Sequence, residues 1–86
     1  MPAKPKETRA WQLFNQLAYT PTNRRVIAQA FIEDEGDIPA EVVHSFAMTA
    51  QGVEDAAAVD EMVRTMRAEH FARLGKPVPK CRIEYR

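Results

Sequence analysis

The sequence has little of what disulfide-linked, linker-rich or membrane-spanning proteins are built from. Of its 86 residues, one is cysteine, three are glycine and six are proline. The single cysteine, Cys81, cannot form a disulfide within the chain, which favours a reducing compartment. No apolar run approaches the roughly 18 residues of a membrane span, so we expect no membrane as a partner.

Motifs for catalysis and for binding a cofactor or metal are also missing. The groups that an enzyme could use include His44, His70, Cys81, Tyr19 and Tyr85, and their positions match no motif that joins a nucleophile, a base and an orienting group. The chain has no glycine-rich phosphate loop. Two histidines and one cysteine far apart in the sequence do not match a zinc-binding pattern. We therefore expect a protein that is not an enzyme and that uses no cofactor.

The chain does contain enough apolar material for one small folded domain. Hydrophobic residues make up 45% of the sequence, which is ordinary for a globular protein. A chain of this length can bury a single modest core. We divide it into a polar N-terminal tail (residues 1–6), a helical domain (7–75) and an extended basic C-terminal arm (76–86).

Apolar residues recur at helical spacing in four segments, which predicts an all-α fold. The expected helices cover residues 7–19, 21–35, 38 or 39 to 50, and 53–74. Thr20 suits the N-cap of the second helix and Pro21 its first position. Asp37 suits the N-cap of the third helix, and Gly75 is expected to end the fourth. The predicted architecture is a small bundle-like domain of about four helices.

The last six residues, "CRIEYR", follow a different pattern. Cys81, Ile83 and Tyr85 alternate with charged residues, as in a β-strand. The rest of the chain offers no second strand, and a lone strand leaves its backbone hydrogen-bonding groups unmet. We expect this arm to pair with a second copy, to add to the sheet of a partner, or to lie extended against the helices. A homodimer through the fourth helix and the arm is one of these alternatives.

The formal net charge of zero hides a strong segregation of charge along the chain. Residues 1–25 carry +4, residues 26–63 carry −9 without any lysine or arginine, and residues 64–86 carry +5. A summed charge says nothing about local fields. The acidic middle could contact a basic surface on another protein or the basic ends of this chain, or it could be only a solvated face.

The charges of the expected second helix oppose that helix at both ends. Glu33, Asp34 and Glu35 lie at its C-terminus, where the helix dipole disfavours each acid by up to about 1 kcal/mol. Arg24 and Arg25 lie in its first turn, where cations are disfavoured for the same reason. This double mismatch indicates that neither cluster serves the stability of its own helix.

The predicted function is non-catalytic protein binding, as an adaptor, an inhibitor or an assembly subunit. The candidate contact residues are Glu33, Asp34, Glu35, Cys81, Ile83 and Tyr85. The alternative is a small nucleic-acid-associated regulator that contacts phosphates through Arg24, Arg25, Arg64 and Arg67. The calculated pI of about 6.7 speaks against this alternative, because nucleic-acid-binding domains are usually basic.

The expected location is the cytoplasm. Residues 1–25 are basic and contain a single acid, Glu7. A mitochondrial transit peptide is therefore kept as the alternative.

Overall fold

The computed structural model describes residues 8–79, and within this range the chain forms four helices and no strand. The helices are α1 (Arg9–Gln16), α2 (Pro21–Glu35), α3 (Ala40–Met48) and α4 (Val53–Leu74). The predicted all-α, four-helix fold is confirmed. The predicted N-terminal tail and the predicted strand with Cys81, Ile83 and Tyr85 lie outside the described residues, so both stay predictions.

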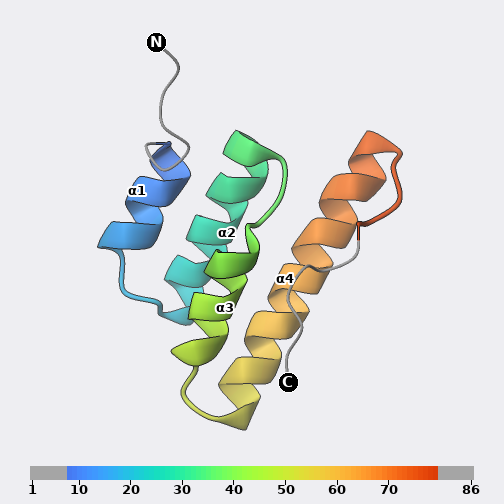
Figure 1. Ribbon diagram of the computed structural model, residues 1–86. Coiled ribbons are helices and arrows are strands. Elements are labelled where there is room, and N and C mark those ends of the chain that lie inside the picture. Colours follow the sequence, from blue (N-terminus) through green and yellow to red (C-terminus); the bar gives the residue numbers. More distant parts are fainter. Residues whose placement is uncertain (1–7, 80–86) are drawn as a thin grey trace.

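The helices alternate in direction along the chain. Figure 1 shows α2 and α4 running one way, and α1 and α3 running the other way. Helix α2 contacts α1 on one side and α4 on the other, and α3 packs against α4. The end of α2 therefore lies beside the beginning of α1, an arrangement that matters for the charges described below.

Local sequence signals account for the ends of α2 and α4. The Thr20 hydroxyl accepts a hydrogen bond from the Asn23 amide at 3.2 Å, and Pro21 occupies the first helical position, where its missing N–H is not needed. Gly36 ends α2 with a φ of 84°, and Gly75 ends α4 with a φ of 70°. Glycine adopts these left-handed conformations without a steric penalty. The predicted bounds of both helices are confirmed.

Helix α1 is shorter at its C-terminal end than predicted. It ends at Gln16 rather than near residue 19, because Leu17 adopts an extended conformation with φ −92° and ψ 143°. The chain then turns so that the Tyr19 hydroxyl donates a hydrogen bond to the Phe14 carbonyl at 2.9 Å. The ring of Tyr19 stacks on that of Phe14, with 5.3 Å between the centroids. Tyr19 thus contributes to the core from outside the helix.

Helix α3 also differs from the prediction at its start. It begins at Ala40, and its N-cap is Pro39, which offers no side-chain hydrogen bond. The predicted N-cap role of Asp37 was wrong. The Asp37 carboxylate accepts a hydrogen bond from the adjacent Ile38 amide and pairs with Arg67 of α4.

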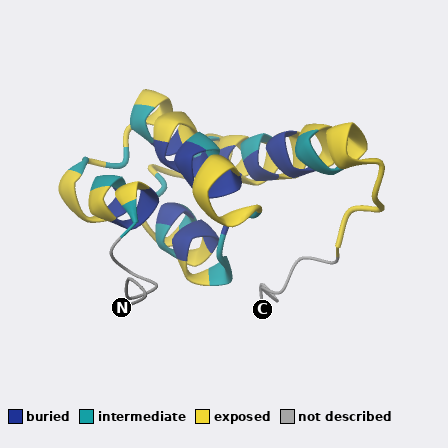
Figure 2. Ribbon diagram, turned by 90° about the horizontal axis from the view of Figure 1, so that it is seen from above, coloured by how far each residue is buried: buried dark blue, intermediate teal, exposed yellow. Residues whose placement is uncertain are grey.

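The core is built from one face of each helix. Its largest fully buried side chains are Phe31, Phe46, Ile27, Val42 and Val59. Trp11 lies edge-on to Phe31, with 4.9 Å between the ring centroids. Figure 2 shows the buried residues on the helix surfaces that face one another. In residues 8–79, no helix is both long enough and apolar enough to cross a membrane.

Candidate functional site

The acids at the end of α2 contact the beginning of α1. Asp34 Oδ2 accepts a hydrogen bond from the Ala10 amide at 3.2 Å, and Glu35 Oε2 accepts one from the Thr8 hydroxyl at 3.2 Å. The N-terminus of a helix carries partial positive charge, so acids are favourable there. The acids that oppose their own helix therefore complement its antiparallel neighbour.

Arg9 of α1 adds a charge contact to the same cluster. Its Nη2 atom lies 3.1 Å from Glu33 Oε1 and 3.3 Å from Asp34 Oδ1. Hydrogen bonds from Gln29 and from Arg9 lower the pKa of Glu33 below its usual value. The hydrogen bond to Glu33 and the charge of Asp34 raise the pKa of Arg9. All three predicted acidic contact residues thus have partners within the domain.

Arg24, at the other end of α2, is buried rather than offered to solvent. Only 3% of its side chain is exposed, and its Nη1 and Nη2 atoms lie 2.8 and 3.0 Å from the two oxygens of Asp55. Asp55 belongs to the first turn of α4 and also accepts a hydrogen bond from the Gln51 amide at 2.8 Å. The hydrogen bonds from Arg24 and Gln51 lower the pKa of Asp55 from 3.8 to about 2. This pair joins the beginnings of α2 and α4.

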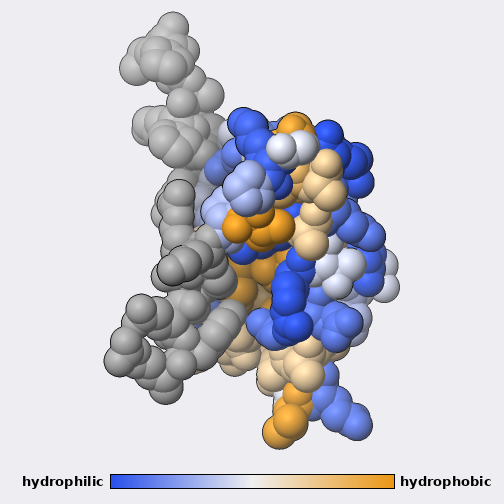
Figure 3. Space-filling model, turned by 90° about the vertical axis from the view of Figure 1, so that its right-hand side faces the viewer, coloured by the Kyte–Doolittle hydropathy of each residue, from blue (hydrophilic) through white to orange (hydrophobic). Residues whose placement is uncertain are grey.

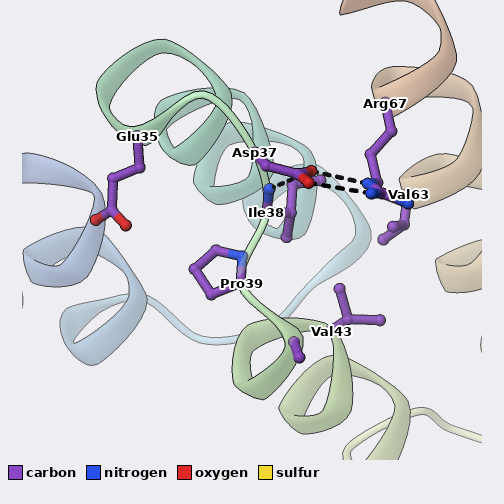
Figure 4. A pocket seen from close by; sticks show the side chains of 8 residues that line it. Glu35, Asp37, Ile38, Pro39, Val43, Val63 and Arg67 are labelled. Carbon is purple, nitrogen blue, oxygen red and sulfur yellow. Dashed lines mark hydrogen bonds and ion pairs between the residues drawn. The ribbon is translucent and has the colours of Figure 1, made fainter. Parts of the chain in front are cut away.

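A second arginine–aspartate pair joins the end of α2 to α4. Arg67 Nε and Nη2 donate to the two oxygens of Asp37 at 2.8 and 3.0 Å, and Nη2 also donates to the Pro79 carbonyl at 3.1 Å. Figure 4 shows this pair beside a hollow of about 240 Å³ between the α2–α3 loop and α4, with Glu35 pointing away from Arg67. The two pairs therefore link α4 to the first turn of α2 and to the loop that follows α2.

The four predicted phosphate-contacting arginines do not form one surface. Arg24 and Arg67 are held by carboxylates, and they lie near opposite ends of the contact between α2 and α4. Arg64 pairs with Asp60 one turn earlier on α4. Arg25 is exposed and, within residues 8–79, makes no ion pair.

A groove of mixed polarity lies on the α2–α4 face to which α3 contributes no residue and α1 contributes Arg9 and Leu13. It consists of two adjoining hollows of about 430 and 500 Å³ that share Arg25, Met66 and Glu69. Its apolar lining includes Val26, Ala57, Ala58, Met62 and Met66. Its charged lining consists of Arg9, Arg25, Glu33, Glu54, Glu61 and Glu69. We call this feature the α2–α4 groove.

The α4 glutamates of the groove have no charge partner in the described part of the chain. Glu54, Glu61 and Glu69 are exposed, and none of them takes part in an ion pair or a side-chain hydrogen bond among residues 8–79. They are spaced by seven and eight residues along α4. Because seven or eight residues make about two helical turns, the three glutamates lie on one side of the helix. Sequence reasoning missed these residues because it followed the densest acidic cluster. The sequence did contain a signal for them. The glutamates recur about every two turns, and the residue four positions after Glu54 and Glu61 is alanine or threonine rather than a base that could pair with them.

A second apolar surface lies at the turn between α3 and α4. Met48 is 73% exposed and Val53 is 87% exposed. A hollow of about 340 Å³ beside them is lined mainly by Ala47, Ala56 and Val59. Figure 3 shows orange and pale-orange atoms at the lower end of the molecule, where this turn lies. This surface lacks the unpaired glutamates that line the α2–α4 groove.

The comparisons assign no family to the chain. Searches against models of protein families, against curated proteins and against solved structures found no match. Among the side chains of residues 8–79, no three of His, Cys, Asp or Glu lie together so that they could hold a metal ion. A proposal for the function therefore depends on the geometry of the helices and of the α2–α4 groove.

Proposed function

We propose that this chain is a small non-catalytic protein-binding module, such as an adaptor, an inhibitor or an assembly subunit. The observation that carries the proposal is the α2–α4 groove. Its lining combines methionine, valine and alanine with three glutamates that have no partner among residues 8–79. Methionine is flexible and polarizable, which suits an adaptable contact surface. Unpaired charges at the edge of a groove steer a partner of opposite charge and set its register.

The proposed contact surface differs from the one that the sequence suggested. Asp34 and Glu35 are engaged with the start of α1, and only Glu33 of that cluster also lines the groove. The acids proposed to meet a partner are therefore mainly those of α4. Cys81, Ile83 and Tyr85 remain proposed contacts of the C-terminal arm, outside the described residues.

Two neighbouring acids of α4 provide a matched test of this proposal. Glu61 lines the α2–α4 groove, whereas Asp60 lines the alanine-rich hollow beside α3. Glu61→Lys and Asp60→Lys make the same change of charge at adjacent positions. Each variant and the wild type are used to capture proteins from an extract of the source cells, and the captured proteins are compared by quantitative mass spectrometry.

We expect Asp60→Lys to retain the partner of the wild type and Glu61→Lys to lose it. Far-UV circular dichroism checks that both variants keep the helical fold. Equal capture by all three proteins would show that the groove is not the contact surface. The mass of the wild-type protein at two salt concentrations tests separately whether a second copy is the partner.

The alternative, a nucleic-acid-associated regulator, remains a proposal without an observation that favours it. Of its four arginines, Arg25 is the one without a carboxylate partner in the described range. A gel shift with generic DNA and RNA at low salt tests it, because phosphate contacts are strongest there. Retardation that Arg25→Gln abolishes would support the alternative, and no retardation at low salt would exclude it.

A further inference from the structure

We propose that the α2–α4 groove binds a basic amphipathic helix of another protein, with lysine or arginine residues spaced about two turns apart. This inference rests on the proposed function and names the chemistry of the partner. It follows from the shape of the groove, from the distribution of its unpaired charges and from the packing of α3 against another side of α4.

The shape of the groove suits a helix. The groove runs between α2 and α4, which point in the same direction (Figure 1). An amphipathic helix that lays its apolar face into such a groove is a common mode of recognition. Helix α3 already packs against α4, and it buries Val42, Val43 and Phe46 in the core. A partner helix in the groove would cover the face of α2 and α4 that α3 leaves open.

The apolar lining sets where the partner must be apolar. Ala30 and Met66 form the buried part of the lining and are 3% and 7% exposed, whereas Val26 is 46% exposed. Met62 is half-buried between these extremes. A helix with leucine-like residues along one face would cover Val26 and Met62 and contact Met66 from outside.

The unpaired charges set where the partner must be charged. Glu54, Glu61 and Glu69 are spaced by seven and eight residues along α4, which corresponds to about 10 and 12 Å. A helix alongside α4 meets all three with basic residues at seven-residue intervals. Arg25 on the α2 side of the groove faces the opposite edge of the partner and favours an acid there. Arg9 of α1 also lines the groove, but it is paired with Glu33 and Asp34. The complementary pattern is therefore one basic edge, one apolar face and an acidic position opposite Arg25.

The binding experiment uses the full chain and three designed 18-residue peptides with blocked ends. The first peptide has a leucine face and lysines at seven-residue intervals, the second replaces these lysines by glutamates, and the third is a scramble of the first. Affinity is measured by isothermal titration calorimetry at 50 and 300 mM salt. Circular dichroism measures whether the peptide becomes helical on binding.

We expect the lysine peptide to bind at least tenfold more tightly than the other two, to gain helicity and to weaken as salt increases, since screening weakens exposed charge contacts. Glu61→Lys should weaken its binding at least tenfold, and Asp60→Lys should leave it unchanged. Ala58→Arg, which fills the groove at an exposed helical position, should also abolish binding.

Several outcomes would overturn the inference. Equal binding of the lysine and glutamate peptides would refute the charge pattern, and binding without added helicity would refute the helical occupant. A mass of the free protein that doubles at low salt and returns to that of one chain in Glu61→Lys would assign the groove to a second copy. If Glu61→Lys abolishes capture of a cellular partner while no peptide binds, the proposed function stands and the helical occupant is rejected.

Discussion

Replacing Asp55 by asparagine removes the counter-charge of a buried arginine. The Arg24 side chain is 3% exposed, and both of its terminal nitrogens contact Asp55 at 2.8 and 3.0 Å. Asparagine keeps the shape of the side chain, but it has no charge and presents an NH₂ donor to one of the two guanidinium donors. Removing one partner of a fully buried pair is destabilising by about 3–5 kcal/mol, and this is the upper bound here because the Asp55 side chain is 18% exposed. A domain of this length is stable by roughly 4–13 kcal/mol in total, so the variant should lose a large share of its stability.

A matched control and a double variant separate this effect from the loss of any ion pair. Asp60→Asn removes the partner of Arg64 in a pair whose side chains are 70% and 56% exposed, and such surface pairs contribute about 0–1 kcal/mol. In the double variant Arg24→Met/Asp55→Asn, an apolar side chain replaces the buried cation, so most of the lost stability should return. Urea unfolding followed by circular dichroism at 222 nm gives the free energy of unfolding of each variant.

Two results would refute this reasoning. The first is an Asp55→Asn variant that is no less stable than Asp60→Asn, because the burial of Arg24 would then have no energetic consequence. The second is a double variant as unstable as Asp55→Asn alone, because the loss would then come from the removed carboxylate rather than from the orphaned cation.

Further predictions follow from the caps, the core and the pKa values. Asp34→Ala removes the acceptor of the Ala10 amide; it should destabilise the protein by about 1 kcal/mol and speed amide exchange in α1 more than in α4, as hydrogen exchange would measure. Gly36→Ala places a side chain at a φ of 84° and should cost about 1–2 kcal/mol in urea unfolding. Phe46→Ala removes a fully buried ring and should cost about 3–5 kcal/mol, visible as a lower Tm. Because the folded-state pKa of Asp55 is lowered from 3.8 to about 2, its contribution is complete above about pH 4 and lost as the pH falls towards 2. The slope of stability against pH in that window should be smaller in Asp55→Asn, and an unchanged slope would contradict the assignment.

The sequence correctly predicted the helix ends that are determined by residues at or next to those ends. Thr20 and Pro21 at the start of α2, and Gly75 at the end of α4, act within one turn of their positions, so the sequence suffices for them. The end of α1 was missed because it depends on the bond from Tyr19 to the Phe14 carbonyl and on ring packing in the core. Those contacts depend on the folded arrangement of the helices.

The charges at the ends of α2 could be recognised as unfavourable from the sequence, but their partners could not be identified from it. It showed that Arg24 and Asp34 oppose the dipole of their own helix. Their partners, Asp55 and Ala10, are 31 and 24 residues away and become neighbours only through the packing of α2 against α4 and α1. The α2–α4 groove could not be predicted for the same reason, because it forms only when the helices pack together. The spacing of Glu61 and its neighbours acquires meaning only once α3 is known to cover the other face.

The methionine methyl groups allow the most direct test of the α2–α4 groove as the contact surface. Met62 and Met66 line the groove, whereas Met48 is 73% exposed at the distant turn between α3 and α4. In protein labelled with ¹³C at the methionine methyls, the lysine peptide or a captured partner is added and the methyl resonances are followed by NMR. The resonances of Met62 and Met66 should shift while that of Met48 stays in place. A shift of Met48 with Met62 and Met66 unchanged would contradict the groove as the contact surface.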